Sequence, residues 1–424
     1  MLAAEVIAVA VFLLTYAFII DGRVHRSVAA MGGASAVVLA QVVPWDAVPS
    51  YLDLDTLLLL IGMMIIVGTA RESGLFEYIA IRTAKAARGS PVRVLVLFAL
   101  VTAVVSAFLD NVTTVLLLTP MLLYIARTME VSAVPLLLAE IFASNIGGTA
   151  TLIGDPPNIM IASAAGLGFN DFLLTMGPIA LLNLLVVTGM LAWIAERRMR
   201  IGPEQRQVIR RRIEALNEQS AIRDRHLFGR SVATIVLVVA LFFLHGFVGL
   251  EPAAVALIGA SVILLWTRAS PEAIFEKIEW PALFFFGGLF IVVGALVETG
   301  LIAALAGAIV ANVDSTGEAL LIIAWFSAFA SALVDNIPLT ATLIPLIRDM
   351  GLSMDVTPLW WALSLGACLG GNGSAIGASA NVVVLGIAAR ERVDITFLEF
   401  LAYGVPVLAV TMAIGTAVLW LRFV

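Results

Sequence analysis

Two aspartates interrupt strongly apolar stretches of this chain, and each is followed by an asparagine. The pairs are Asp110-Asn111 and Asp335-Asn336. A carboxylate in the middle of a membrane is costly on insertion scales, so such a residue has a local structural role, a functional role, or both. Capping of the helix that follows each pair is the local role. Two symmetric carboxylates also favour a cation or proton site.

Glycine-rich segments follow each pair further along the chain. Gly147-Gly148 and Gly370-Gly371 predict unwound backbone, and Asp155 before two prolines predicts the N-cap of a new half-helix. Half-helix ends of this kind point into the membrane. Their N–H groups attract oxyanions or hydroxyl oxygens, whereas unwound carbonyls and carboxylates attract cations.

The candidate site for substrate and ions consists of the polar side chains and glycines of these segments. Its members in the first half are Asp110, Asn111, Thr113, Thr114, Asn145, Gly147, Gly148, Thr149, Thr151, Asp155 and Asn158, and in the second half Asp335, Asn336, Thr340, Gly370, Gly371, Asn372, Ser374 and Asn381. For any single serine or threonine, an ordinary helix-to-helix hydrogen bond is the alternative role. The set contains no lysine or arginine, the residues that usually hold a carboxylate or phosphate. A small neutral polyhydroxyl species, a weakly held anion or a metal cation would fit better.

Cys368 is the only cysteine and stands beside the second glycine-rich segment. One thiol cannot build a multidentate metal site, so we expect it to pack rather than to bind a metal. No bound metal and no cofactor is predicted.

The elements that position this site are predicted to be membrane helices. The chain is 61% hydrophobic and 13% charged, compared with about half and a quarter in soluble domains. Its apolar runs are continuous and about as long as the roughly 20 residues that a spanning helix needs, which argues against a β-barrel. The fold class is therefore all-α integral membrane. Nucleic-acid binding is not indicated.

The two halves of the chain repeat three groups of residues in the same order. Leu57, Gly62, Gly68, Glu72, Gly74 and Leu75 match Leu283, Gly288, Gly294, Glu298, Gly300 and Leu301; Ser106, Ala107, Asp110 and Asn111 match Ser331, Ala332, Asp335 and Asn336; Gly147, Gly148, Gly154 and Asn158 match Gly370, Gly371, Gly377 and Asn381. Five predicted crossings separate equivalent positions, so the second half should be inverted. We predict a first repeat over 1–195, a linker over 196–230 and a second repeat over 231–424. Each repeat has about five crossings, one re-entrant hairpin and broken helices. The hairpin tips lie near 110–112 and 335–337.

The linker predicts the orientation in the membrane. It carries ten arginines against five acidic residues, and the positive-inside rule places it in the cytoplasm. If the predicted spans alternate in direction from this linker, only Arg348 and Arg422 of the 24 Lys and Arg residues lie on the external side of the membrane. Both termini are then external. We expect the protein to lie in the cell inner (plasma) membrane. Leu2 to Ile20 lacks a basic n-region and a cleavage site, so we expect a retained spanning helix.

Two strings carry a resemblance to a known superfamily. They are Phe108-Leu109-Asp110-Asn111-Val112-Thr113-Thr114 and Asn145-Ile146-Gly147-Gly148-Thr149-Ala150-Thr151-Leu152-Ile153-Gly154-Asp155-Pro156-Pro157-Asn158. The chain resembles the ion-transporter superfamily, especially the branch of arsenite permeases (ArsB type), NhaD-type sodium/proton antiporters and the P protein. The resemblance implies a scaffold domain, a mobile transport domain, elevator-type alternating access and a homodimer. The divalent-anion branch carries Ser-Asn-Thr at its tips, and the departure at Asp110-Asn111-Val112 argues against dicarboxylate uptake.

The resemblance and the uncharged donors together favour export of arsenite or antimonite, as neutral trihydroxides, in exchange for protons. Sodium/proton antiport, another anion permease and a passive channel are the alternatives. A primary pump would need a separate ATPase subunit, because the chain has no Walker A Gly-Lys pair. An intramembrane aspartyl protease would need a Gly-x-Gly-Asp signature, which is absent around Asp110 and Asp335. We therefore expect a transporter and not an enzyme.

Overall fold

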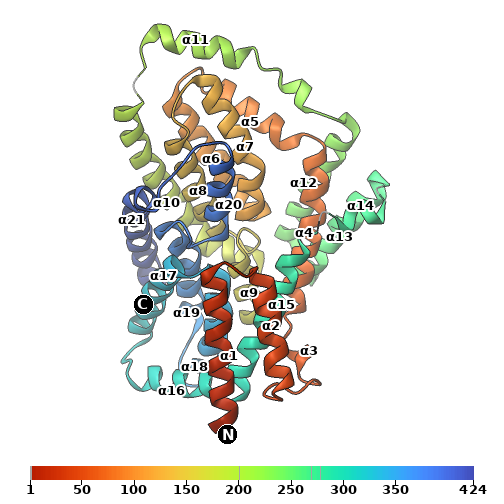
Figure 1. Ribbon diagram of the computed structural model, residues 1–424, viewed down its shortest axis with the longest axis vertical. Coiled ribbons are helices and arrows are strands. Elements are labelled where there is room, and N and C mark those ends of the chain that lie inside the picture. The colour runs from red at the N-terminus through yellow and green to blue at the C-terminus, as the bar shows by residue number, and fades with distance from the viewer. Residues whose placement is uncertain (1, 200, 269, 277) are drawn as a thin grey trace.

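The computed structural model describes residues 2–199, 201–268, 270–276 and 278–424, and the described chain is helical without strands (Figure 1). Arg200 and Lys277, which the orientation argument counted as cytoplasmic, lie outside these residues. Within the described residues nine helices are long and apolar enough to cross a membrane. The predicted all-α membrane fold is confirmed.

The first half contains ten helices. They are α1 (Leu2–Asp21), α2 (Arg26–Leu39), α3 (Val48–Tyr51), α4 (Leu54–Glu72), α5 (Leu75–Ala86), α6 (Pro91–Leu109), α7 (Asn111–Met129), α8 (Val134–Thr149), α9 (Pro156–Ala165) and α10 (Phe169–Arg198). The linker adds α11 (Pro203–Glu214) and the 3₁₀ turn η1 (Glu218–Ala221).

The second half repeats this order. Its helices are α12 (Arg225–Val248), α13 (Pro252–Thr267), α14 (Pro271–Phe275), α15 (Trp280–Glu298), α16 (Leu301–Ala311), α17 (Thr316–Leu333), α18 (Asn336–Met350), α19 (Thr357–Gly370), the 3₁₀ turn η2 (Gly371–Gly373), α20 (Ser379–Arg390) and α21 (Phe397–Phe423). The series α4 to α10 therefore corresponds to α15 to α21, helix by helix.

The packing of the helices follows the same symmetry and divides them into two groups. In the first, α2 packs on α15 and α13 packs on α4, while α1 and α12 flank them. In the second, α6 packs on α8 and α17 on α19, with α9 against α18 and α20 against α7. We call these sets the scaffold group (α1, α2, α4, α12, α13 and α15) and the hairpin group (α6 to α10 and α17 to α21). Each half of the chain contributes helices to both groups. In the scaffold group α2 of the first half packs on α15 of the second, and α13 of the second half packs on α4 of the first.

Two short helices, α5 and α16, were missing from the predicted spans. Each follows a glycine of the repeated Glu-x-Gly-Leu motif: Gly74 has φ +83° and Gly300 has φ +74°. Only glycine adopts this left-handed conformation without strain, so the glycine ends one helix and turns the chain into the next. The repeated motif is thus explained by backbone geometry.

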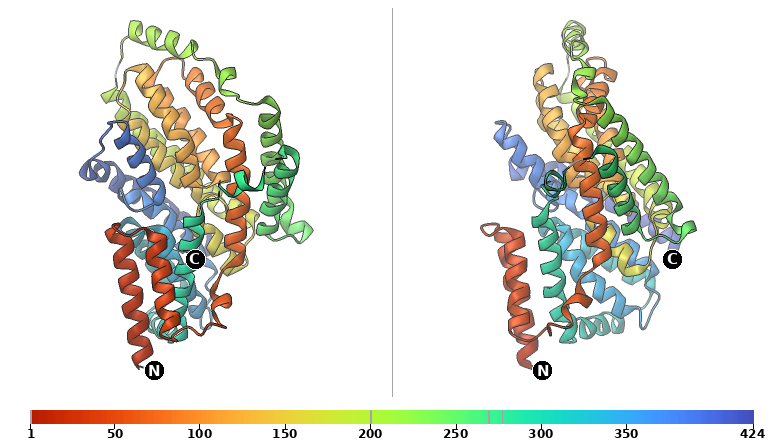
Figure 2. Two further views of the ribbon diagram at one scale, coloured as in Figure 1. Left: turned by 45° about the vertical axis from the view of Figure 1, so that its right-hand side comes forward. Right: turned by 90° about the vertical axis from the view of Figure 1, so that its right-hand side faces the viewer.

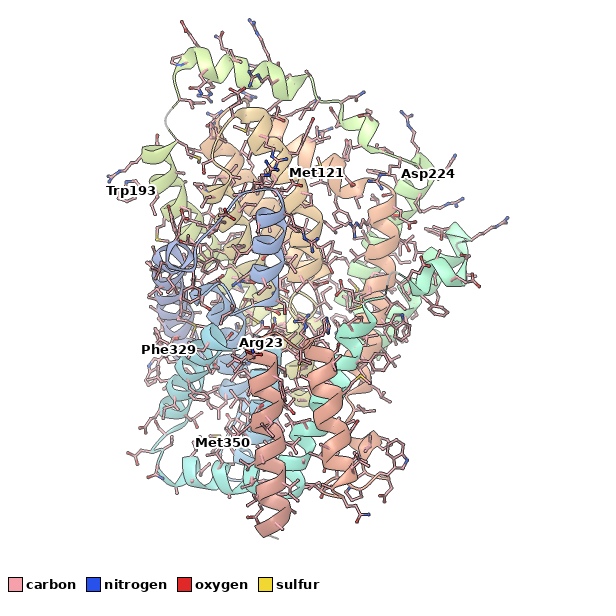
Figure 3. The ribbon with its side chains drawn as sticks, in the orientation of Figure 1. Arg23, Met121, Trp193, Asp224, Phe329 and Met350 are labelled. Carbon is pink, nitrogen blue, oxygen red and sulfur yellow. The ribbon has the colours of Figure 1, made fainter. Side chains whose placement is uncertain are left out.

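The linker folds back over the first half instead of extending freely. It joins α10, which carries Trp193, to Asp224 at the start of α12 (Figure 3). Its Arg212 pairs with Glu130 at 2.6 Å and its Arg223 with Glu77 at 2.9 Å. In both views of Figure 2 the linker lies at the end of the molecule opposite the N-terminus. The sidedness of the linker and termini stays a prediction.

Candidate functional site

The two hairpin tips confirm the predicted capping role of the aspartates. The chain turns at Asp110, whose Oδ1 accepts the Thr113 N–H at 2.8 Å at the start of α7. Asp335 Oδ1 accepts the Ile337 N–H at 3.1 Å at the start of α18. Asp110 has φ +90° and ψ +153°, a backbone conformation that is strained for a residue with a Cβ. Capping accounts for only one oxygen of each carboxylate.

Asp335 also binds an arginine, which the sequence reasoning had excluded from the site. Arg26 Nη1 lies 3.4 Å from Asp335 Oδ2 and 2.5 Å from Ser379 Oγ. Ser379 Oγ in turn donates to Asp335 Oδ2. The prediction that no lysine or arginine reaches the site is therefore wrong. Arg26 was placed in the short connection directly before a predicted span that begins at Ser27, whereas it is the first residue of α2 and contacts the hairpin tip.

The prediction that Gly147 and Gly148 are unwound is also wrong. Helix α8 continues through both residues to Thr149, and the irregular segment is 150–155. A Cβ on Gly147 would lie 2.2 Å from the Ala103 carbonyl oxygen in α6, and one on Gly148 would lie 2.6 Å from the Gly154 oxygen. These glycines let backbones approach closely. In the second half Gly370 ends α19 with a Cβ position 2.6 Å from the Ala328 oxygen, and Gly371 begins the 3₁₀ turn η2.

An asparagine bridges each interrupted segment. Asn158 Nδ2 donates to the carbonyl oxygens of Gly148 at 3.1 Å and Thr151 at 2.9 Å. Asn381 Nδ2 donates to those of Gly371 at 2.7 Å and Ser374 at 2.8 Å. These carbonyls have lost their helical partners, and the buried amides replace them. Both donors are therefore used inside the protein.

The centre of the site is a cluster of buried asparagines from both repeats. Asn145 Nδ2 donates to Asn372 Oδ1 at 3.0 Å and Asn381 Oδ1 at 3.1 Å, while Asn111 Nδ2 donates to Asn145 Oδ1 at 3.4 Å. Asn111 Oδ1 and Asn372 Nδ2 have no partner within the described protein, although both are buried. An unused acceptor and an unused donor thus lie on either side of Asn145.

Asp155 and Asn336 form a second polar contact between the repeats. Asn336 Nδ2 lies 3.2 Å from each oxygen of Asp155. Asp155 stands at the N-cap of α9, as predicted, but its side chain makes no capping hydrogen bond there. Cys368 Sγ lies 3.3 Å from Asn158 Oδ1, so the thiol packs against the site without a second sulfur ligand.

The predicted serine and threonine hydroxyls mostly bond to backbone. Those of Thr114, Thr149, Thr151, Thr340 and Ser374 donate to the carbonyls of Asp110, Asn145, Ala107, Asn336 and Ala332 respectively. Thr113 contributes its backbone N–H to Asp110 and lines the cavity described next. The predicted alternative, a hydrogen bond to another helix, describes Thr151 and Ser374, whereas Thr114, Thr149 and Thr340 bond to the carbonyl four residues earlier in the chain.

A small cavity of about 50 Å³ separates the hairpin tips from the scaffold group. Arg26 and Glu279 line it from the scaffold side, and Asp110, Thr113 and Ser379 line it from the hairpin side. A water needs about 10–15 Å³ by the same kind of measure, so the cavity has room for a few water-sized groups. Its walls combine two carboxyl groups with one guanidinium.

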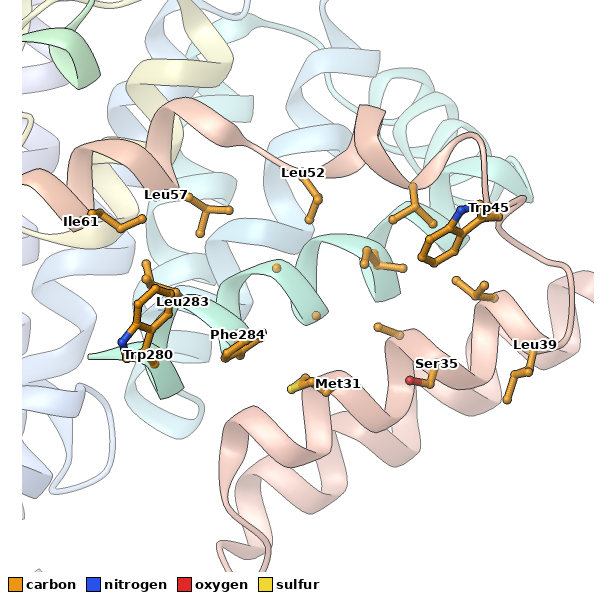
Figure 4. Close-up of a pocket in the computed structure, with 16 residues that line it drawn as sticks. Met31, Ser35, Leu39, Trp45, Leu52, Leu57, Ile61, Trp280, Leu283 and Phe284 are labelled. Atoms are coloured by element: carbon orange, nitrogen blue, oxygen red, sulfur yellow. The ribbon is translucent and has the colours of Figure 1, made fainter. Parts of the chain in front are cut away.

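A cavity of about 700 Å³ is a poor candidate for a polar solute. It lies between α2, α4 and α15 and is lined almost entirely by apolar side chains, among them Met31, Leu57 and Phe284 (Figure 4). A lining of this kind suits hydrocarbon. A third cavity, of about 530 Å³, contains Asp55, Asp171 and His245 near the start of α10.

Sequence reasoning missed three charged residues near the site. Glu140 in α8 is 1% exposed and accepts from the Thr119 hydroxyl at 3.1 Å, with Oε1 unpartnered among the described residues. A glutamate within an apolar run was a visible signal for it. Arg26 and Glu279 gave no such signal, because both stand at the ends of apolar runs.

Comparisons with known proteins agree with this architecture. The sequence model of a family described as Citrate transporter matches residues 16–366. An uncharacterized transporter of Mycobacterium tuberculosis is 45% identical over 99% of both chains. The P protein of Sus scrofa is 35% identical over 97% of this chain, which spans 59% of that protein. The YdaH transporter of Alcanivorax borkumensis matches with a TM-score of 0.59 at 15% identity, over 99% of this chain and 98% of that one. The predicted resemblance to the ion-transporter superfamily is confirmed.

Proposed function

Because the chain belongs to the citrate transporter family and is a multi-pass membrane transporter, we propose that it exports a small neutral trihydroxide in exchange for protons. Arsenite and antimonite are the solutes of this chemistry. The coupling proton binds to a carboxyl group at the hairpin tips.

The observation that carries the proposal is the pair of unpartnered atoms beside Asn145. Asn111 Oδ1 can only accept a hydrogen bond and Asn372 Nδ2 can only donate one. A hydroxyl group does both, so a ligand with several hydroxyls satisfies the two atoms together. An anion without hydrogens leaves Asn111 Oδ1 unsatisfied, and a bare cation leaves Asn372 Nδ2 unsatisfied.

The charges around the site disfavour an anionic substrate such as citrate. Asp155 lies beside the second hairpin tip, because both of its oxygens are 3.2 Å from Asn336 Nδ2, next to Asp335 in the chain. Among the described residues that line the small cavity, the one guanidinium is that of Arg26, and it already pairs with Asp335. An entering carboxylate would therefore meet like charges without a free cation to pair with.

The division into scaffold and hairpin groups supports alternating access. The site residues Asp110, Asn145, Asp335 and Asn372 all belong to the hairpin group or its connections. Movement of this group against a fixed scaffold would carry the whole site from one side to the other, as in elevator-type carriers. A homodimer joined through the scaffold is part of this proposal.

The test uses purified protein in sealed vesicles with an imposed pH gradient. We expect gradient-driven arsenite uptake, and little uptake of arsenate, which is anionic at neutral pH. Asn111→Leu and Asn372→Leu each remove one partner of a buried hydroxyl, a loss of about 1–3 kcal/mol, or roughly 5- to 150-fold in affinity. Asn183→Leu is the matched control. Asn183 is also a buried asparagine with an unpartnered oxygen, but it lies in α10 against α21.

Sodium/proton antiport is the second candidate, because several carboxyl and amide oxygens gather at the hairpin tips. Vesicles that exchange sodium for protons but ignore arsenite and antimonite would refute the trihydroxide and support this candidate. Equal losses of arsenite uptake in Asn111→Leu and Asn183→Leu would refute the binding role of the asparagine cluster.

A further inference from the structure

The two hairpin aspartates match in sequence but differ in their surroundings. Asp335 is bonded by Arg26, the first residue of α2, and by Ser379, the first residue of α20. The equivalent helices of the other repeat, α13 and α9, begin with Pro252 and Pro156. Proline side chains carry neither charge nor donor. Among the described residues, the ion pairs at the hairpin tips include Asp335 but not Asp110.

Arg26 is held by the scaffold group, whereas Asp335 and Ser379 belong to the hairpin group. The Arg26 guanidinium lies over the ring of Phe285 on α15, 5.2 Å from its centroid. Phe285 is fully buried, which fixes one side of the guanidinium. The opposite side reaches across the group boundary to Asp335 and Ser379. Any movement of the hairpin group against the scaffold must break these contacts.

We propose that Arg26 is a built-in cation that neutralises Asp335 and latches the hairpin group to the scaffold, so that of the two hairpin aspartates Asp110, which faces Glu279 across the small cavity, is the one left to take the coupling ion. Arg26 is thus a positioning residue, and the aspartates of the two repeats have different roles. The assignment of coupling to Asp110 rests on the proposed function. The latch does not, because it concerns the contact between the two groups whatever solute is carried.

The latch is tested by thiol labelling, which needs no substrate. Ala282 lines the small cavity on the scaffold side, opposite Asp110 and Ser379. A cysteine at Ala282→Cys becomes accessible to a maleimide when the hairpin group moves away. The native Cys368 is fully buried, so the parent protein measures the background. In the Ala282→Cys protein we expect Arg26→Gln to raise the labelling rate about fivefold, and Asp335→Asn to do the same.

Two controls separate the latch from a general loss of stability. Arg23→Gln removes a neighbouring arginine whose side chain is 87% exposed and, within the described residues, pairs with Asp21 two positions before it. This change should leave the labelling rate unchanged. The double variant Arg26→Gln/Asp335→Asn leaves no uncompensated charge, which preserves folding. Its rate should equal that of either single variant, since both remove the same contact. Equal rates for Arg26→Gln and Arg23→Gln, or single effects that multiply in the double variant, would overturn the latch.

Gradient-driven transport then tests the division of roles. Asp335→Asn should retain proton-driven exchange with an altered rate, whereas Asp110→Asn should lose it by tenfold or more while keeping its cap. Loss in Asp335→Asn with retention in Asp110→Asn would reverse the roles and refute the assignment. If the parent protein transports no trihydroxide but the labelling results hold, the proposed substrate fails and the latch stands.

Discussion

Replacing Gly147 with alanine tests whether the repeated glycines serve packing or ligand binding. The new Cβ would lie 2.2 Å from the oxygen and 2.5 Å from the Cα of Ala103, in the backbone of α6. Ordinary contact begins at 3.4 Å, so α6 would have to move by 3.4 − 2.2 = 1.2 Å. Backbone atoms cannot rotate away as a side chain can.

Overpacking of this kind costs typically about 1–3 kcal/mol. Alanine in place of glycine returns up to about 1 kcal/mol through helix propensity. We therefore expect Gly147→Ala to lower the free energy of unfolding by about 1–2 kcal/mol. Gly370→Ala should act in the same direction, because its Cβ would lie 2.6 Å from the Ala328 oxygen in α17.

Thermal unfolding of the purified variants in one detergent measures this effect. Gly189→Ala in α10 is the matched control, since nothing lies within 4 Å of its Cβ position. It should raise the unfolding temperature, opposite in sign to Gly147→Ala. The packing argument fails if Gly147→Ala leaves the unfolding temperature unchanged and instead weakens substrate affinity, because that result would mean that the glycine backbone contacts the ligand.

Two further predictions concern the backbone around the site. Asn158→Asp replaces an amide that donates to three carbonyl oxygens with a carboxylate oxygen that faces them. The free energy of unfolding should therefore fall by several kcal/mol, whereas Asn312→Asp on the surface should leave it nearly unchanged. Similar unfolding temperatures for the two variants would contradict this. Gly74→Ala should destabilise the protein more than Gly300→Ala. Both glycines have positive φ, which costs about 1–2 kcal/mol for alanine. Only at Gly74 would the added Cβ also meet the Ala221 carbonyl oxygen of the linker, at 1.8 Å. Equal shifts in unfolding temperature would show that the linker does not rest there.

The sequence predicts the helices and the caps well because those signals are local. A long apolar run needs no information about its neighbours, and Asp110 and Asp335 cap the residues directly after them. The short helices α5 and α16 were missed because each follows a longer apolar run with only a glycine turn between them. Their signal was the repeated Glu-x-Gly-Leu motif, in which glycine marks a left-handed turn.

The errors at the site have a common physical cause. Glycine in a sequence shows that a Cβ is absent, but it does not show whether the backbone unwinds or a neighbour comes close. At Gly147 the Cβ is absent because the backbone of α6 packs against this position. The sequence does not show which helix packs there. Threonine and asparagine present the same ambiguity. Thr149 bonds to the Asn145 carbonyl one turn before it in the same helix, whereas the Asn372 amide nitrogen has no partner in the described part of the chain.

Internal symmetry explains why the arginine at the site was overlooked. A repeat predicts what the two halves share, namely two hairpins, two aspartates and two bridging asparagines. It does not predict where the two halves differ. The helices that begin with Arg26 and Ser379 correspond to helices that begin with Pro252 and Pro156 in the other repeat. These differences lie at helix starts that are far apart in the chain, and only the packing of α2 beside the second hairpin brings them to Asp335.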